Sequence, residues 1–251
     1  MMKLMIAALS VSCAAALSAQ PNPGQDVRVD VRVLGIVRNG DTTTVTYRLH
    51  VERTSGERLR SFTVDGTGAP FVVHRPEPRD HWVTSTEWRG RRVARWAALA
   101  LVAQGDSTPP LVLKAVGLPG ITSGWLRGHV SPNEAQSYRI DSIWYAQHPD
   151  GSGDVIYQYM LEVPLVGIDP PLPTATTAAH AAKLRDLTTQ ACAYGWITDA
   201  GACASLNGLA GGPPKPRDYL AVLDAGRRAG SVNTLAYWML KVRAEALSPR
   251  P

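Results

Sequence analysis

The chain contains 251 residues, of which 45% are hydrophobic and 19% are charged, and its formal net charge is +5. This apolar content is enough for a core and excludes a globally disordered chain, while the length allows one large domain or two smaller ones. The small positive excess favours anionic surfaces or polymers only weakly, since solubility alone explains it equally well.

Residues 1–19 are predicted to be a secretory signal peptide. A positive charge at Lys3 precedes the apolar or small segment Leu4–Leu17, and we expect cleavage after Ala19. The segment is shorter than the ~20 residues of a membrane-spanning helix, and no later segment is apolar enough to cross a bilayer. Lipoprotein anchoring through Cys13 is not favoured, because the leucine expected before it is displaced to Leu9. The protein is therefore expected to be secreted or periplasmic, where nucleic acid is not a partner.

Residues 20–167 show the two-residue period of half-buried strands. Valine alternates with charged residues from Val27 to Val33, and Asn39-Gly40 then gives a strong hairpin signal before a second alternating segment. Further strands are expected at Leu59–Val64, Phe71–His74, His81–Trp88, Val93–Val102, Leu111–Val116, Trp125–Val130, Tyr138–Ala146 and Val155–Val163. The pattern predicts an all-β sandwich, immunoglobulin-like in the broad sense, although the cysteine pair of true immunoglobulin domains is absent.

A change of composition at residues 168–177, which are rich in proline and threonine, predicts a linker. Residues 178–247 then follow the helical period and predict a small all-α domain of four short helices. The expected positions are Leu184, Leu187 and Ala191 on one face of the first helix, Gly195 at its end, Asp199 as the N-cap of the second helix, Gly230 at the end of the third and Ser231 as the N-cap of the fourth.

Two cysteines, Cys192 and Cys203, lie within this helical region. Three interpretations are open for such a pair: a redox site, a metal site or a structural disulfide. The spacing is not Cys-x-x-Cys, and no histidine lies between the two cysteines, whereas an exported chain favours oxidation. We therefore predict a disulfide that contributes about 3 kcal/mol in the chain-entropy picture. Trp196 is expected to fill the space beneath it.

The helical region resembles a known family of domains. The stretches LRDLTTQACAYGWITDAGACASLNGLAG and YLAVLDAGRRAGSVNTLAYWMLKVRAEAL are similar to the FIMAH-type C-terminal domain of secreted bacterial proteins. The shared features are the paired Leu184 and Leu187, Gly195 before Ile197, a leucine-rich second helix and a last helix after a short turn. The resemblance covers residues 178–247, and the preceding strands are similar to the β-sandwich modules upstream of such tails. It implies extracellular placement and contact with a protein or a surface, and it transfers no catalytic residue.

The sequence lacks the signatures of several enzyme classes. GxSxG, HExxH and the phosphate-binding P-loop are all absent. His74 and His81, with Glu77 and Asp80 between them, could form a surface metal site, but a proline-stiffened loop explains them better, so we expect no metal and no cofactor. Two carboxylates of a glycoside hydrolase can come from distant parts of a sequence, but the candidates here have no distinguishing context. They are Glu52, Asp65 and Glu87.

The segment HWVTSTEWRGRRVARW is the strongest candidate for a binding surface. It combines aromatic faces with guanidinium groups, which stack on sugars and hold sulfate or carboxylate groups. The candidate residues are Trp82, Trp88, Arg89, Arg91, Arg92 and Arg95. The alternative, which we favour, is that the tryptophans fill the sandwich core while the arginines keep a hairpin tip in water.

Together these features predict an exported, non-catalytic binding or structural protein. A β-sandwich surface is combined with a disulfide-stapled helical interaction module, and the expected partner is an extracellular protein or polysaccharide. Two alternatives stay open. One is a secreted hydrolase with an unrecognised site, and the other is a carbohydrate-binding module, which requires Trp82 and Trp88 to be exposed in a planar row.

Overall fold

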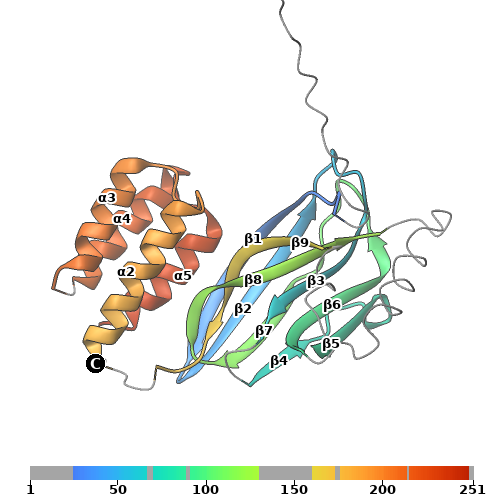
Figure 1. Cartoon of the computed structure of the whole chain (residues 1–251), viewed down its shortest axis with the longest axis horizontal. Coiled ribbons are helices and arrows are strands. Elements are labelled where there is room, and N and C mark those ends of the chain that lie inside the picture. Colours follow the sequence, from blue (N-terminus) through green and yellow to red (C-terminus); the bar gives the residue numbers. More distant parts are fainter. Residues whose placement is uncertain are drawn as a thin grey trace, which may run out of the picture.

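The computed structural model describes residues 25–66, 70–88, 91–129, 160–172, 176–213 and 215–248, and every structural statement below concerns these residues. All described strands precede all described helices, and Figure 1 shows the helices gathered on one side of the strands. Several predictions fall outside the described residues: the signal peptide, Cys13, Arg89, the strand Tyr138–Ala146 and the first part of the strand Val155–Val163.

The strands form two antiparallel sheets, which confirms the predicted sandwich. One sheet has the order β1 (Val29–Asn39), β2 (Thr42–Val51), β7 (Leu111–Val116), β4 (Phe71–His74). The other has the order β5 (Trp82–Trp88), β6 (Arg91–Val102), β3 (Leu59–Asp65), β8 (Leu118–Gly128), β9 (Leu161–Asp169). The neighbours β1-β2-β7 and β3-β8-β9 correspond to strands A-B-E and C-F-G of an immunoglobulin sandwich, so the fold is immunoglobulin-like in the broad sense.

Three aromatic rings occupy the space between the sheets. Tyr47 of β2, Phe62 of β3 and Trp96 of β6 are almost completely buried, with ring centroids 5.5 to 6.2 Å apart. The Tyr47 hydroxyl donates a hydrogen bond of 2.6 Å to the Val166 carbonyl oxygen, so its one polar group is satisfied inside the core. Because these rings come from both sheets, they fix the separation of the layers.

The hairpin signal at Asn39-Gly40 is confirmed. Asn39 pairs with Thr42 across a two-residue turn, and Gly40 has a φ of 61°, which glycine adopts without steric cost. This turn brings Arg38 and Asp41 to one end of the sandwich, where the corner between β7 and β8 also lies, because the Gly117 N–H donates to the Asp41 carbonyl oxygen.

Some predicted boundaries are wrong. Strand β8 begins at Leu118 instead of Trp125, and β9 ends at Asp169 instead of Val163. The segment LPGITSG looked like a turn because of its proline and glycines. However, β3 pairs with β8 only from Gly124 onward, so the first half of β8 is hydrogen-bonded to β9 alone. Pro119, which has no N–H to donate, is tolerated there because one side of the strand needs no donor. The predicted linker 168–177 is correspondingly shorter, since it starts after β9.

A smaller boundary difference concerns β5. The predicted strand began at His81, but Arg79–His81 form a single 3₁₀ turn and β5 starts at Trp82.

Four helices follow the strands: α2 (Thr177–Ala193), α3 (Ala200–Gly211), α4 (Pro216–Arg228) and α5 (Thr234–Glu245). The helix stops predicted at Gly195 and Gly230 are confirmed by positive φ angles of 69° and 77°. Asp199 is confirmed as an N-cap, because its carboxylate accepts a hydrogen bond of 2.6 Å from the Ala202 N–H.

The N-cap predicted for the last helix is wrong. Asn233, not Ser231, caps α5 by accepting a hydrogen bond of 2.9 Å from the Ala236 N–H. The intervening Val232 pairs with Ile197 in an isolated β-bridge, so the chain stays extended for two more residues before the helix begins. Ser231 instead donates its hydroxyl to the Gly226 carbonyl oxygen.

The predicted disulfide joins Cys192 at the end of α2 to Cys203 in α3. Trp196, in the turn between these helices, is buried as expected. Buried leucines form the rest of the small helical core, and the Tyr219 hydroxyl shares a hydrogen bond of 2.8 Å with the Thr188 hydroxyl inside it. None of the described helices is both long and apolar enough to cross a membrane.

The helical part rests on the sandwich through α5. This helix contacts β1, β8 and β9. At its first turn the Thr234 hydroxyl accepts a hydrogen bond of 3.3 Å from the Val33 N–H, and at its last turn Arg243 enters the sandwich edge. The two parts are therefore held together at both ends of one helix.

Candidate functional site

The structure separates the two predicted tryptophans. Trp82 is 4% exposed and belongs to the sandwich core, whereas Trp88 is partly exposed with the Arg95 guanidinium 4.7 Å from its ring centre. A register shift between Ser85 and Glu87 breaks the two-residue period on β5, which is why even spacing did not place both rings on one surface. The planar exposed row required for the carbohydrate-binding alternative is not formed.

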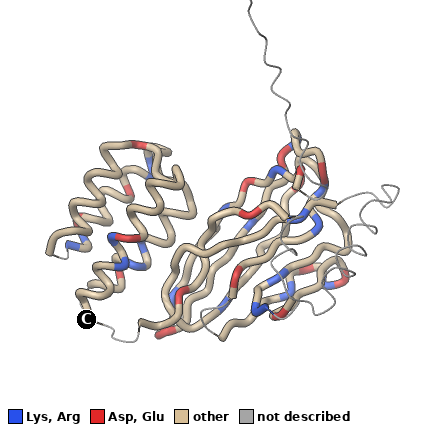
Figure 2. The backbone as a smooth tube through the Cα atoms, in the orientation of Figure 1, with Lys and Arg blue, Asp and Glu red and all other residues tan. Residues whose placement is uncertain are grey.

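The arginines of this segment lie on β6. Arg91 and Arg92 are exposed at its start, and the Arg92 guanidinium lies 5.6 Å from the centre of the Phe71 ring. A binding role for Arg91, Arg92 and Arg95 stays a prediction. Figure 2 shows basic and acidic residues interspersed over the strands and the helices, so the net positive charge is spread over the described part of the chain.

The histidines considered for a metal site are exposed, and Glu77 between them forms an ion pair of 2.9 Å with Arg79. Within the described ranges, no group of three or more His, Cys, Asp or Glu side chains is arranged to hold a metal ion.

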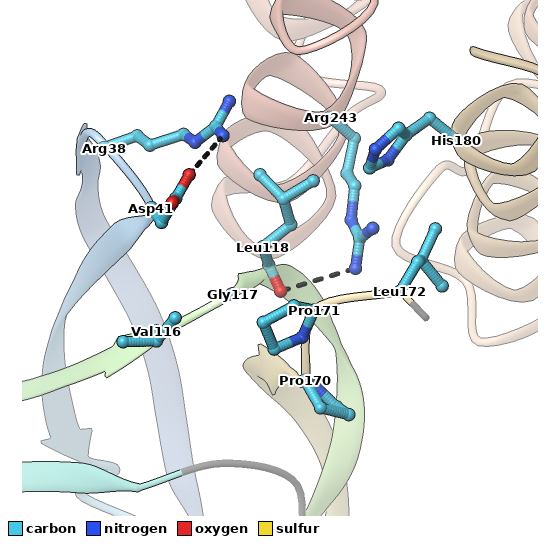
Figure 3. Close-up of a pocket in the computed structure, with 10 residues that line it drawn as sticks. All are labelled: Arg38, Asp41, Val116, Gly117, Leu118, Pro170, Pro171, Leu172, His180 and Arg243. Atoms are coloured by element: carbon cyan, nitrogen blue, oxygen red, sulfur yellow. Dashed lines mark hydrogen bonds and ion pairs between the residues drawn. The ribbon is translucent and has the colours of Figure 1, made fainter. Parts of the chain in front are cut away.

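A pocket of about 240 Å³ lies where the helical part meets the sandwich, and Figure 3 shows its lining. The lining residues come from the β1–β2 turn, the β7–β8 corner, the segment after β9, the start of α2 and the end of α5. They are Arg38, Asp41, Val116, Gly117, Leu118, Pro170, Pro171, Leu172, His180 and Arg243.

The sandwich wall of the pocket depends on Gly117. Its φ of 134° is accessible to glycine, and a Cβ atom there would lie 1.9 Å from the Asp169 carbonyl oxygen. The Thr43 hydroxyl also donates a hydrogen bond of 2.5 Å to the Gly117 carbonyl oxygen. These contacts hold the corner against the neighbouring turn and define this side of the pocket.

Arg243 forms the boundary between the two parts. It is 3% exposed, and its Nε donates to the Pro119 carbonyl oxygen at 2.6 Å, while Nη2 donates to Leu118 at 3.3 Å and to the Asp169 carboxylate at 2.6 Å. Lys183 of α2 also approaches this carboxylate, at 3.3 Å. Burial lowers the pKa of Arg243 and Asp169 opposes that effect, but an arginine starts so high that it stays charged.

Arg38 and His180 contribute polar atoms that the protein leaves unsatisfied. Arg38 Nε and His180 Nδ1 are buried without a hydrogen-bond partner. The guanidinium of Arg38 only approaches the exposed carboxylate of Asp41, at 3.7 Å. Burial, and then the charges of Arg243 and Arg38, lower the pKa of His180, so the imidazole is neutral at pH 7. A buried polar group without a partner costs about 1–3 kcal/mol.

Little in the sequence indicates this pocket. Its lining residues lie between positions 38 and 243, on elements that meet only in the fold. The available signal was an arginine at position 243, next to the apolar stripe of the last helix, and that signal is common at helix ends.

Comparison with known proteins gives little further information. No protein-family model matches the chain, and no curated protein sequence matches it significantly. One similar solved structure is described as the crystal structure of an uncharacterized protein from Nocardia farcinica that reveals an immunoglobulin-like fold. It is 18% identical, has a TM-score of 0.30, and the match covers 42% of this chain and 80% of that chain. The fold assignment above therefore depends on the strand order, and the resemblance of residues 178–247 to FIMAH-type domains stays a prediction.

Proposed function

We propose that this protein is an exported, non-catalytic binding protein whose ligand site is the pocket between the sandwich and the helices. One observation carries the proposal: Arg243 fixes the two parts together beside a pocket whose lining includes Arg38 and His180, each of which has one buried nitrogen atom without a partner. A preformed concave site with a few convergent polar groups is the usual form of a small-molecule site.

The lining chemistry supports binding over catalysis. Among the described residues, the pocket is lined by arginine, aspartate, histidine and apolar or backbone groups, without the serine, threonine, cysteine or lysine nucleophile of many covalent mechanisms. Its acid–base groups are His180 and Asp41, and the Asp41 side chain is 84% exposed. The disulfide between Cys192 and Cys203 is consistent with export, because such bonds persist in oxidising compartments. The secreted hydrolase stays an alternative that no feature of this pocket favours.

The proposal can be tested on the purified mature chain with a panel of small carboxylates, phosphates, amines and neutral sugars. We expect at least one class to raise the unfolding temperature saturably, without turnover of chromogenic ester, glycoside or peptide substrates. The variant Val116→Trp should abolish the effect, because Val116 lines the pocket and is partly exposed. Val72→Trp is the matched control, since it is exposed on the same sheet outside the pocket. Saturable turnover, no response from any class, or a response that survives Val116→Trp would refute the proposal.

A further inference from the structure

We infer that the outer face of the five-stranded sheet carries a second binding surface, for an acidic polysaccharide, at the end of the sandwich farthest from the helices. Four residues form it, and together they are called the arginine cluster: Arg58, Arg60, Arg127 and His129. Figure 1 shows β8 running away from the helices, and the cluster lies at the last residues of this strand, roughly 30 Å from the pocket at its first residues. The inference therefore does not depend on the pocket.

The pairing of β3 with β8 brings the cluster together. The His129 N–H donates a hydrogen bond of 2.8 Å to the Arg58 carbonyl oxygen, so these two residues are cross-strand neighbours, and Arg127 lies two residues before His129. Leu59 and Leu126 are buried in the core between the sheets. Because side chains alternate along a strand, Arg58, Arg127 and His129 point to the opposite, outer face.

Arg60 completes the cluster from a bulge in β3. Its guanidinium donates a hydrogen bond of 2.9 Å to the Ala98 carbonyl oxygen, which fixes its position at the edge of the group. The positive charges act on the neighbouring imidazole: burial, and then the three arginines, lower the pKa of His129. The cluster is open to solvent, since Arg58 is exposed and the other three residues are partly exposed.

The three arginines lack a counter-charge, although charges of both signs are mixed over most of the surface. None of them forms an ion pair within the described part of the chain. The carboxylate of Glu57 lies on the other side of β8, in the space into which a Cβ atom at Gly128 would project. On the outer face, Glu162 accepts a hydrogen bond of 2.5 Å from the Ser123 hydroxyl. Cations gathered in this way repel one another, and an anionic partner would remove the repulsion.

The chemistry of this surface favours an acidic polysaccharide over an acidic protein. Guanidinium groups bind carboxylates through paired hydrogen bonds, and a chain of sugars that carry carboxylates can present several of them to neighbouring arginines. A protein interface is usually anchored by large apolar or aromatic side chains. In β3 and β8, all of whose residues are described, no large apolar side chain is exposed. A stiff sugar chain also loses less conformational freedom on binding than a flexible peptide.

The experiment measures binding of the purified mature chain to immobilised polygalacturonate by biolayer interferometry, with neutral dextran and polyglutamate as comparison polymers. We expect saturable binding of polygalacturonate at low salt and a loss of about tenfold in affinity at ten times the salt concentration, because ions screen exposed charges. Dextran should not bind. Polyglutamate should bind about fivefold more weakly, since it pays more ordering entropy.

Two variants test the assignment to the cluster. Arg58→Gln and Arg127→Gln should each weaken polygalacturonate binding about fivefold, because each removes one of the three charges. Arg48→Gln is the matched control: it removes the same charge from an exposed position on β2, in the other sheet, and should change the affinity little. Arg58→Gln should leave the unfolding temperature unchanged or raise it, because it relieves repulsion without removing a buried group.

Each contrary result overturns the inference at a stated point. Absence of polygalacturonate binding, or binding that is unchanged in both cluster variants, would overturn the surface, and so would an equal loss in Arg48→Gln. Equal or tighter binding of polyglutamate would overturn the polysaccharide and indicate an acidic protein segment as the partner. Val116→Trp should leave polygalacturonate binding unchanged, so failure of this surface and failure of the proposed pocket are distinguishable.

Discussion

The sandwich and the helical part are stabilised by different kinds of interaction. The sandwich buries three large aromatic rings between two sheets whose strands are distant in the sequence. The helical part has short helices around a small core of leucines, and a disulfide joins two of them. Small domains bury too little apolar surface to be stable without such additions. The size of the core therefore determines where a covalent link is needed.

The largest expected effect comes from the sandwich core. Trp96→Ala should destabilise the sandwich by about 3–5 kcal/mol, because a completely buried indole is replaced by a cavity. The variant also removes the hydrogen bond of 3.0 Å from Trp96 Nε1 to the His74 carbonyl oxygen, which links β6 to the edge strand of the other sheet. Urea unfolding followed by circular dichroism measures the loss.

The matched control for Trp96 is Leu99→Ala on the same strand. Leu99 is 53% exposed, so its truncation should change the free energy of unfolding by less than about 0.5 kcal/mol. Equal effects of the two variants would mean that the aromatic cluster is not the main source of stability in the sandwich.

The disulfide gives the second largest effect, and it should be local. Replacing Cys192 and Cys203 together by alanine should destabilise the helical part by about 3 kcal/mol, because the unfolded chain regains the freedom of the closed loop. Hydrogen exchange resolved by peptide should become faster in α2 and α3 and stay unchanged in β2 and β3.

Reduction of the unmodified chain with a thiol provides the control for the double variant, since it breaks the same bond without changing any side chain. Reduction and the double substitution should accelerate hydrogen exchange in the same peptides. If exchange in the sandwich rises as much as exchange in the helices, then the two parts unfold as one unit and the comparison between them fails.

The third effect concerns the junction between the two parts. Arg243→Met should cost about 2–3 kcal/mol, because it leaves the carbonyl oxygens of Leu118 and Pro119 without their buried donor. It should also separate a single thermal transition into two, measured by calorimetry. Lys183→Met is the control: this partly exposed lysine contacts the same Asp169 carboxylate, and its loss should cost no more than about 1 kcal/mol. Two equally destabilised variants would show that Arg243 has no special role in coupling the parts.

Much of the fold could be predicted from local sequence signals. The two-residue period, the Asn39-Gly40 turn and the glycines after the helices are local features, and the structure has the expected elements at each of them. The start of β8 was missed because a strand that is hydrogen-bonded on one side only tolerates proline. Whether a strand has one neighbour or two depends on how all the strands are arranged. Strand neighbours are a property of the whole fold.

The pocket was harder to predict than the fold. Arg38, His180 and Arg243 share no spacing, because each belongs to a different element and they meet only through the docking of α5. The tryptophan and arginine segment gave a clear local pattern, yet a bulge in β5 placed Trp82 in the core and Trp88 outside it. Local patterns therefore indicate elements more reliably than they indicate which side chains meet.

The smallest effect distinguishes two possible caps of α5, the helix that joins the parts. Asn233→Ala should destabilise the helical part by about 1 kcal/mol, since its side chain accepts the hydrogen bond of the Ala236 N–H. Ser231→Ala should cost less, because the Ser231 hydroxyl only adds a third bond to the Gly226 carbonyl oxygen, which already accepts from the Ser231 and Val232 N–H groups. Urea midpoints of the two variants measure the difference. A greater loss in Ser231→Ala would mean that the sequence signal at Ser231, and not the extended segment through Val232, determines where the helix begins.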